Sequence, residues 1–370
     1  MAPDDPLFRP GYTVLPDGRV RFVLDAPEAS EVLVAADFTH WEKAPIPMRR
    51  QNRHQPWAVT VGPLPAGIHF YLFLVDGAWV QDPAHPMEEH NGLWGWNSAL
   101  AVHGPGVGPP EALRIASLNL HTWQEKNASL KLEQVAWSLA ELDVHMVALQ
   151  EVGEHQADTA RPNAGEFIAR RMARHSGHAY HHVWRFAHIG FDVYREGLSV
   201  ISRGPIHQVL EAELAIGPLR RVAMLAEVEW NGRRINLCNV HLSDNANGGY
   251  EQASQLVHHI LPRYTPAETP SILLADLNAQ PHEGTANLLR EAGWHDAASL
   301  CIPPGDMSPT FFGEHPHRRI DYQFVKPGSA PASALRPVSL HRLYARNAVA
   351  NCYLPEVSDH AGLLGVYQLP

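Results

Sequence analysis

The hydrophobic pattern divides the chain into two regions of different periodicity. Residues 11–103 contain short apolar runs separated by proline, glycine and turn residues, with no helical period. Runs of this length and spacing are typical of a β-sandwich. The predicted strands of this region cover residues 19–24, 31–35, 57–61, 68–75, 78–80 and 98–102.

Beyond residue 112 the pattern changes to apolar strands that alternate with amphipathic helices. This alternation predicts an α/β domain. The predicted strands are 113–120, 144–149, 197–202, 221–230, 234–241, 271–277, 319–325 and 362–369. The predicted helices are 127–142, which Asn127 or Ser129 can cap, and 166–175, 250–261 and 284–292.

A segment rich in proline and glycine separates the two patterns. At 370 residues the chain is too long for one ordinary hydrophobic core. We therefore predict a β-sandwich over residues 1–104, a linker over 105–111 and the α/β domain over 112–370.

Composition excludes several classes of protein. No stretch approaches the roughly 18 apolar residues of a membrane span, and the N-terminus lacks the features of a secretory signal, so we expect a cytoplasmic protein. The 3 cysteines are isolated, which argues against a disulfide framework or a structural zinc site. The formal net charge of -10 and the lack of a basic run argue against a protein that grips long nucleic acids.

Polar side chains recur at the ends of the predicted apolar strands of the second region. In α/β proteins such positions hold ligand-binding and catalytic groups. Carboxylate, amide and imidazole groups together suit a hard metal ion and a phosphate. The residues are Asn119, Glu151, His241, Asp276, Asn278, Asp321, Asp359 and His360.

Seven segments carry a family resemblance, in family order: SLNLHTW, ALQEV, YREGLSVISR, NVHLS, LLADLNAQP, RRIDYQFV and SDHAGLL. Residues 112–369 thereby resemble the endonuclease/exonuclease/phosphatase superfamily. The resemblance implies a four-layer α/β/β/α sandwich, like that of deoxyribonuclease I. It also implies a metal-dependent hydrolase of phosphate esters.

The resemblance implies a metal site and its ligands. Glu151 is then the principal metal carboxylate, with Asn119 beside it and Asp359 as a further ligand. Oxygen ligands of this kind favour Mg²⁺, with Mn²⁺ as a substitute.

The resemblance also implies roles in proton transfer and phosphate binding. His360 is then the general base or acid, held by Asp321, while His241 donates to a phosphoryl oxygen or the leaving group. Asp276 and Asn278 meet the scissile phosphate and the attacking water. The remaining implied site residues are Glu196 behind His241, Tyr194 as the active-site tyrosine, and Arg220 or Arg221 as the arginine that faces the phosphate.

The first region is similar to the immunoglobulin-like early-set sandwiches of glycogen-binding modules and of glycogen-branching enzymes. Exposed tryptophans of such modules stack on sugar rings. The resemblance places Trp41, Trp79 and Asn97 at the α-glucan contact, but Leu72 stands where glycogen-binding members usually have a lysine. The alternative is a sandwich with a purely structural role.

The sequence therefore predicts a metal-dependent enzyme that hydrolyses a phosphodiester, or a related small phosphate ester, by in-line attack of water. One alternative is a Mg²⁺-dependent endonuclease or abasic-site nuclease. The other alternative is a non-catalytic glucan-binding scaffold.

Overall fold

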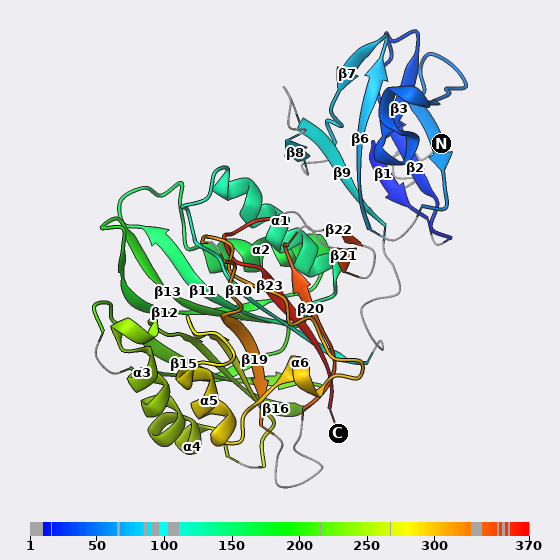
Figure 1. Ribbon diagram of the computed structural model, residues 1–370. Coiled ribbons are helices and arrows are strands. Elements are labelled where there is room, and N and C mark those ends of the chain that lie inside the picture. The colour runs from blue at the N-terminus through cyan, green and yellow to red at the C-terminus, as the bar shows by residue number, and fades with distance from the viewer. Residues whose placement is uncertain are drawn as a thin grey trace. The chain divides into compact units, whose positions relative to one another are not determined.

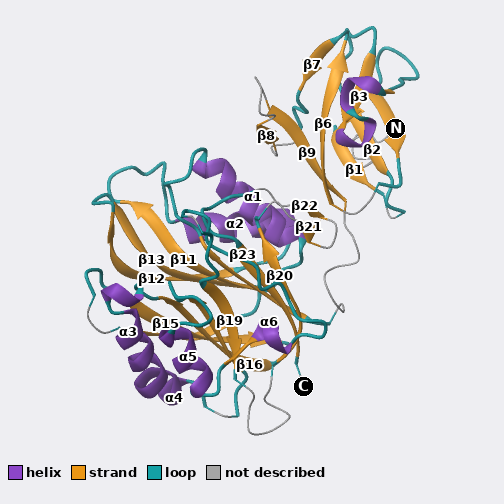
Figure 2. Cartoon of the chain, in the orientation of Figure 1, coloured by secondary structure: helices purple, strands orange, loops and turns teal. Residues whose placement is uncertain are grey.

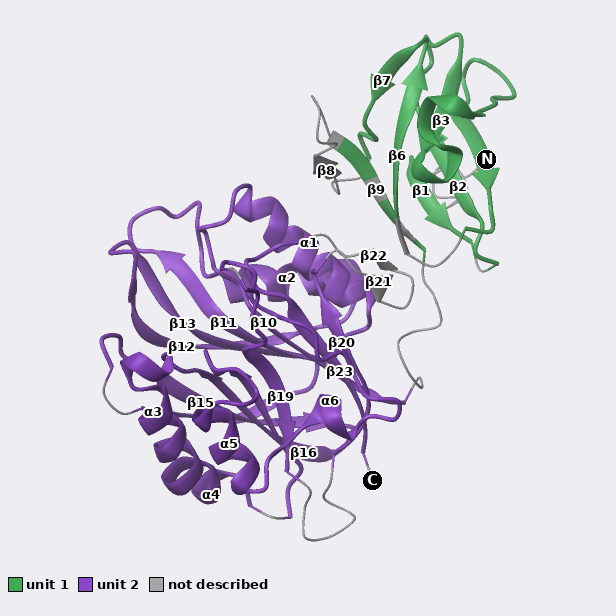
Figure 3. Ribbon diagram, in the orientation of Figure 1, with its two compact units in different colours: residues 1–105, 350–353 green, residues 106–349, 354–370 purple. Residues whose placement is uncertain are grey.

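The computed structural model describes residues 10–15, 17–64, 67–84, 88–90, 96–102, 111–214, 217–266, 268–314, 316–326, 335–345, 348–349, 352–353 and 356–369. The chain forms two compact units (Figure 3). One unit contains residues 1–105 with 350–353, and the other contains residues 106–349 with 354–370. Of the predicted linker, residues 105–110 lie outside the described part of the chain.

The first unit is a β-sandwich, as predicted. One sheet has the order β1-β2-β5, and the other has the order β4-β3-β6-β9-β8 with β7 paired to β6. Phe22, Tyr71 and Phe73 pack edge-to-face in the core between the sheets. The strands are β1 (Gly11–Val14), β2 (Val20–Leu24), β3 (Val32–Ala36), β4 (Ile46–Pro47), β5 (Trp57–Val61), β6 (Gly67–Val75), β7 (Ala78–Val80), β8 (Glu88–His90) and β9 (Trp96–Val102).

The second unit contains two six-stranded mixed sheets. The first has the order β12-β13-β11-β10-β23-β20, and its strands are β10 (Leu113–Asn119), β11 (Met146–His155), β12 (His181–Gly190), β13 (Tyr194–Ser202), β20 (Arg336–Leu343) and β23 (Gly362–Gln368). The second has the order β14-β15-β16-β17-β19-β18, and its strands are β14 (Ile206–Glu213), β15 (Val222–Trp230), β16 (Arg233–His241), β17 (Ser271–Asp276), β18 (His295–Asp296) and β19 (Asp321–Val325). The short strands β21 (Ala348–Val349) and β22 (Cys352–Tyr353) belong to neither sheet.

Helices cover the outer face of each large sheet (Figures 1 and 2). The first sheet carries α1 (Ala128–Glu141) and α2 (Ala164–Ser176). The second carries α3 (Gly249–Gln255), α4 (Leu261–Tyr264) and α5 (Gly284–Glu291), while α6 (Ala297–Leu300) follows β18. A π-helical turn at Leu256–Ile260 joins α3 to α4. This arrangement confirms the predicted four-layer α/β/β/α sandwich.

The middle strands are apolar because both faces of each sheet are covered. Every residue of β10, β17 and β19 is buried. One apolar core fills the space between the two sheets, and another lies between the second sheet and its helices. Burial of this extent is the main stabilising contribution to the second unit.

Two buried amide side chains join the sheets by hydrogen bonds. Asn239 of β16 donates to the backbone carbonyls of Leu149, at 3.0 Å, and Ser199, at 2.9 Å, in the first sheet. Gln323 of β19 donates to the carbonyls of Ile115 and Leu363, each at 3.1 Å. These bonds fix how one sheet lies on the other, because a buried carbonyl without a partner is costly.

A tight hairpin turn connects β15 to β16. Asn231 and Gly232 both have positive φ, 50° and 74°. Asn-Gly is the preferred pair for such a two-residue turn. Among the described residues, no helix is both long and apolar enough to cross a membrane.

Candidate active site

The predicted site residues gather where strands of both sheets end or begin. β10 ends at Asn119, β16 at His241 and β17 at Asp276, while β19 starts at Asp321. β16 and β17 are parallel, and β19 is antiparallel to β17, with Asp276 directly opposite Asp321. These pairings bring the ends of the strands to one edge of the sandwich.

A hydrogen bond between Asn119 and Asp276 connects the two sheets at this edge. The Asn119 amide donates to Asp276 Oδ2 at 3.0 Å, and the backbone N–H of Asn278 donates to Asp276 Oδ1 at 3.0 Å. Both carboxylate oxygens are therefore oriented. Burial, and then repulsion from the Asp321 carboxylate, raise the pKa of Asp276 to about 7.

His360 lies between two carboxylates. Its Nδ1 is 3.0 Å from Asp321 Oδ2, and its Nε2 is 3.9 Å from Asp276 Oδ2. Burial lowers the pKa of His360, but the Asp321 and Asp276 carboxylates outweigh burial and raise it to about 10. The ring is therefore an imidazolium at neutral pH, with Nε2–H directed toward Asp276.

His241 is neutral and has a defined tautomer. Arg221 Nη1 donates to His241 Nδ1 at 2.8 Å, so the ring proton is on Nε2. Burial, and then the Arg221 charge, hold the pKa of His241 well below its usual value. Nε2 lies 3.5 Å from Asp276 Oδ2 and 3.8 Å from Glu151 Oε1. Asn278 Nδ2, 3.2 Å from Nε2, donates to the Leu242 carbonyl at 3.0 Å.

Glu151 is placed by a β-bulge. The pairing of β11 with β13 is regular up to Leu149 and shifts before Val152, and Glu151 has a φ of 48°. A bulge of this kind changes the direction in which a side chain points. Burial, and then repulsion from Glu196, raise the pKa of Glu151, while a hydrogen bond with Asn119 opposes the rise.

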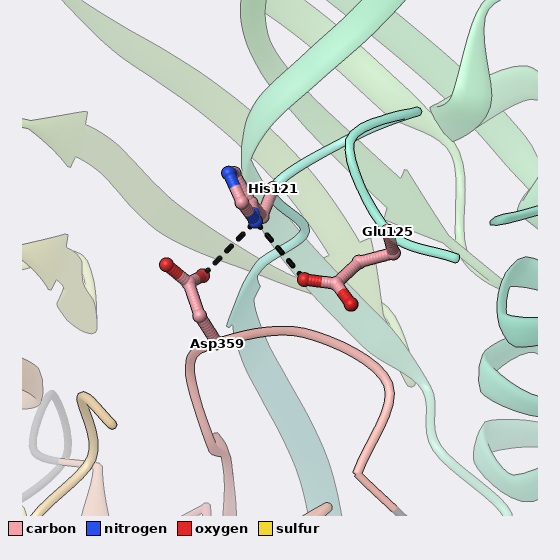
Figure 4. Close-up of side chains that lie close together, drawn as sticks. All are labelled: His121, Glu125 and Asp359. Atoms are coloured by element: carbon pink, nitrogen blue, oxygen red, sulfur yellow. Dashed lines mark hydrogen bonds and ion pairs between the residues drawn. The ribbon is translucent and has the colours of Figure 1, made fainter. Parts of the chain in front are cut away.

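Asp359 belongs to a neighbouring charged cluster (Figure 4). His121 Nδ1 is 3.0 Å from Glu125 Oε1 and 3.5 Å from Asp359 Oδ1. Lys131 also contacts Glu125, at 2.6 Å. His121 and Glu125 were not predicted as site residues, although His121 lies within the first motif, two residues after Asn119.

Tyr194 and Glu196 have partners that the sequence did not predict. The Tyr194 hydroxyl accepts a hydrogen bond from Arg161 at 2.7 Å and is buried. Glu196 pairs with His188 at 3.1 Å, and not with His241. Glu196 therefore acts on the site through its charge, which raises the pKa of Glu151.

The two candidate arginines differ in their surroundings. Arg221 contacts His241, and burial lowers its pKa while the Glu151 and Asp276 charges oppose that effect. Arg220 forms ion pairs with Glu211, at 2.6 Å, and Glu213, at 3.2 Å. Of the two, Arg221 is therefore the one placed to face a phosphate.

The side chains present fit a hard divalent cation. Burial, and then a neighbouring carboxylate, raise the pKa values of Glu151 and Asp276, so a bound cation would favour their ionised forms. Glu151, Asn119 and Asp359 offer oxygen atoms, the ligands that Mg²⁺ prefers. Among the described residues, two groups of three side chains have converging ligand atoms, His121–Glu125–Asp359 and Asp276–Asp321–His360. Glu151 belongs to neither group, and in each group a histidine already pairs with carboxylates.

Comparison with known proteins agrees with this architecture. Residues 116–360 match the Endonuclease/Exonuclease/phosphatase family, and residues 20–100 match the glycogen recognition site of AMP-activated protein kinase. Because the first match covers about two thirds of the sequence, the chain belongs to the endonuclease/exonuclease/phosphatase family. The family and the side chains at this edge of the sandwich define a hydrolase of phosphate esters.

Solved structures share the fold of the second unit at low sequence identity. A family member from Leptotrichia buccalis is 21% identical with a TM-score of 0.58, over 70% of this chain and 100% of that one. D. rerio TDP2, complexed with a single-strand DNA product, is 18% identical with a TM-score of 0.53, over 70% and 99%. A mannosyl-6-phosphatase from Bacteroides thetaiotaomicron is 16% identical with a TM-score of 0.50, over 69% and 99%.

Curated relatives match shorter parts of the chain. The 1,4-alpha-glucan branching enzyme GlgB of Corynebacterium jeikeium is 29% identical over 157 residues, 38% of this chain and 22% of the enzyme. Subunit beta-1 of the 5'-AMP-activated protein kinase of Sus scrofa is 39% identical over 57 residues, 15% of this chain and 43% of the subunit. The chain thus spans less than half the length of either relative.

Proposed function

We propose that this protein is a divalent-metal-dependent phosphodiesterase that acts on a small phosphate ester. The observation that carries the proposal is the convergence of Asn119, His241, Asp276 and His360 at one edge of the sandwich. A cation held by Glu151, with Asn119 and Asp359, would neutralise charge on the phosphate oxygens. Mg²⁺ suits these oxygen ligands, and Mn²⁺ can replace it.

The side chains of the protein supply the proton transfers. Asp276, whose two carboxylate oxygens are oriented by Asn119 and by the Asn278 N–H, accepts the proton of the attacking water. The Nε2–H groups of His241 and His360 donate hydrogen bonds to the phosphoryl and leaving oxygens. Asp321 holds the His360 ring in position.

A substrate panel with and without chelator tests this proposal. Bis-p-nitrophenyl phosphate, p-nitrophenyl phosphate, a phosphotriester, sphingomyelin and DNA would each be assayed with EDTA, Mg²⁺ and Mn²⁺. We expect metal-dependent turnover of the simple diester. Turnover that survives exhaustive chelation contradicts the metal requirement. Plasmid nicking that falls steeply with salt would instead favour the nuclease alternative.

Replacement of the principal carboxylate gives a sharper test. We expect Glu151→Gln to lower kcat/KM at least about 100-fold and to weaken Mn²⁺ binding measured by calorimetry. Glu154→Gln is the matched control, because Glu154 is on the same strand and pairs with Arg195. Equal activity of the two variants would remove Glu151 from the mechanism.

For the first unit we propose contact with an α-glucan through the outer face of β6 and its neighbours. Trp79 is 50% exposed and lies opposite Leu74, so its side chain shares a face with Leu72 and Leu74. The register of β6 with β9 places Asn97 on the same face. The cytoplasmic location stays a prediction from the sequence.

A further inference from the structure

The turn between β12 and β13 has an unfavourable conformation for its sequence. Phe191 and Asp192 have φ values of 50° and 61°, and the N–H of Val193 donates to the Gly190 carbonyl at 3.1 Å. Two-residue turns with positive φ favour glycine and asparagine, whereas a bulky side chain in this region is strained. Local backbone preference therefore does not explain why a phenylalanine stands at position 191.

Burial does not explain the phenylalanine either. Phe191 is 62% exposed, and its neighbours Ile189 and Val193 are 40% and 38% exposed. An apolar group of this size gains little by folding while it remains in water. All three exposed apolar side chains belong to one hairpin, and we name them the hairpin patch.

The hairpin patch lies beside the proposed active site. The Phe191 ring centroid is 6.4 Å from that of His121, and His121 contacts Asp359 at 3.5 Å. On the other side, Gly190 packs so closely on Glu196 that an added Cβ would lie 2.6 Å from its carboxylate. The hairpin is thus held between His121 and Glu196, and the charges of both residues act on Glu151.

The size of the hairpin patch limits what can cover it. A stable protein interface buries at least about 1,000 Å² in total, far more than three half-exposed side chains provide. A single planar ring matches the exposed face of Phe191, and stacked aromatic pairs contribute about 0.5–1.5 kcal/mol. A ring attached to the phosphate of the substrate is small enough for the hairpin patch and has a planar face that can stack on Phe191.

We infer that the hairpin patch is a subsite for an aromatic group esterified to the substrate phosphate, with Phe191 as the stacking residue. The inference rests on the proposed phosphodiesterase function. Phe191 contributes to selection among esters, and the groups that handle protons and phosphate remain those described above.

Two inhibitors with the same phosphonate group isolate the contribution of the ring. Phenylphosphonate and methylphosphonate would be compared as competitive inhibitors of bis-p-nitrophenyl phosphate hydrolysis by the full chain with Mg²⁺. For the wild type we expect phenylphosphonate to bind about three- to tenfold more tightly. Phe191→Ala should bring this ratio close to one, and Phe191→Tyr should retain it.

Two controls separate recognition from folding. Phe191→Gly should also lose the preference without a fall in Tm, because glycine adopts a φ of 50° without strain. Leu300→Ala removes a comparably exposed apolar side chain, 39% exposed, and should keep the wild-type ratio. A wild-type ratio of one, or an unchanged ratio in Phe191→Ala, overturns the inference. Absence of diester turnover in the wild type contradicts the proposed function instead.

Discussion

Three residues at or beside the active site adopt backbone conformations that non-glycine residues rarely have. His121, Glu151 and Asn278 have φ values of 47°, 48° and 49°. Asparagine tolerates the left-handed region of positive φ, but for histidine and glutamate this conformation costs roughly 1 kcal/mol or more each. Each of the three follows or interrupts a buried strand, so the turn changes the direction of the side chain at the strand end. Residue identities alone do not encode such φ values.

The Asp143 carboxylate, away from the active site, predicts that the stability of the protein depends on pH. Asp143 lies within 3.5 Å of Arg114, His145 and Arg203. The His145 hydrogen bond, and then Arg203, hold the pKa of Asp143 well below its usual 3.8. A carboxyl whose pKa is lowered by folding adds stability above its unfolded pKa, and this stability is lost as pH falls.

We therefore expect Asp143→Asn to reduce the free energy of unfolding by about 1–2 kcal/mol at pH 7, since solvent partly screens the half-exposed Asp143. The difference from wild type should shrink as pH falls below about 4. Urea unfolding at pH 7 and pH 3 measures it. Glu251→Gln, at an exposed helix position, should change stability by less than about 0.5 kcal/mol. A difference that is the same at both pH values would exclude the ionised Asp143 as its source.

At the scale of elements, the bulge in β11 depends on a side chain from the opposite sheet. Asn239 donates to the carbonyls of Leu149 and Ser199, which form the last regular pair before the bulge, and accepts from Gln150 at 2.6 Å. A bulge interrupts the hydrogen-bond ladder between β11 and β13, and Asn239 donates to two backbone carbonyls at that point. We therefore expect Asn239 to hold the bulge that positions Glu151.

Asn239→Leu should therefore affect activity more than its effect on folding explains. We expect a loss of about 2–4 kcal/mol of stability, because buried polar groups lose their partners, and at least a tenfold fall in kcat/KM with weaker Mn²⁺ binding. Gln323→Leu is the matched control, since Gln323 is also fully buried and also joins the sheets. Equal losses of activity in both variants, measured where both are folded, would show that Asn239 has only a structural role.

The sequence predicted the inner strands of the second unit and missed its edges. All eight inner strands of the two six-stranded sheets, four in each sheet, were predicted, and the four strands of these sheets that were not, β12, β14, β18 and β20, are the edge strands. The short strands β21 and β22 were not predicted either. Inner strands are buried on both faces and read as continuous apolar runs. β14 is exposed or half-buried throughout, so its pattern resembles that of a loop. β18 has only two residues.

Contacts between site residues were predictable only in part. The motifs identified Asn119, His241, Asp276 and His360, which the structure brings together. The choice between Arg220 and Arg221, which directly precede β15, and the partner of Glu196 depend on the direction in which each side chain points. That direction follows from the register and from bulges, and a one-residue shift reverses it.

At the scale of the whole molecule, the two units should be functionally separable by mutation. We expect Trp79→Ala to abolish retardation in gels that contain glycogen and to leave diester turnover unchanged, because Trp79 belongs to the first unit. Tyr250→Ala is the control, since Tyr250 is 45% exposed but lies in the second unit. Retardation that persists in Trp79→Ala would favour a structural role for the sandwich.

The Asn231–Gly232 turn offers a place to alter the chain without altering its chemistry. His241 is the last of the nine residues of β16, so this turn lies a span of roughly 25–30 Å away from it. A fluorescent tag inserted there, or new termini created there by circular permutation, would leave the catalytic edge of the sandwich untouched. The Asn231–Gly232 turn between β15 and β16 therefore suits reporter attachment, whereas the turn at Phe191 between β12 and β13 does not.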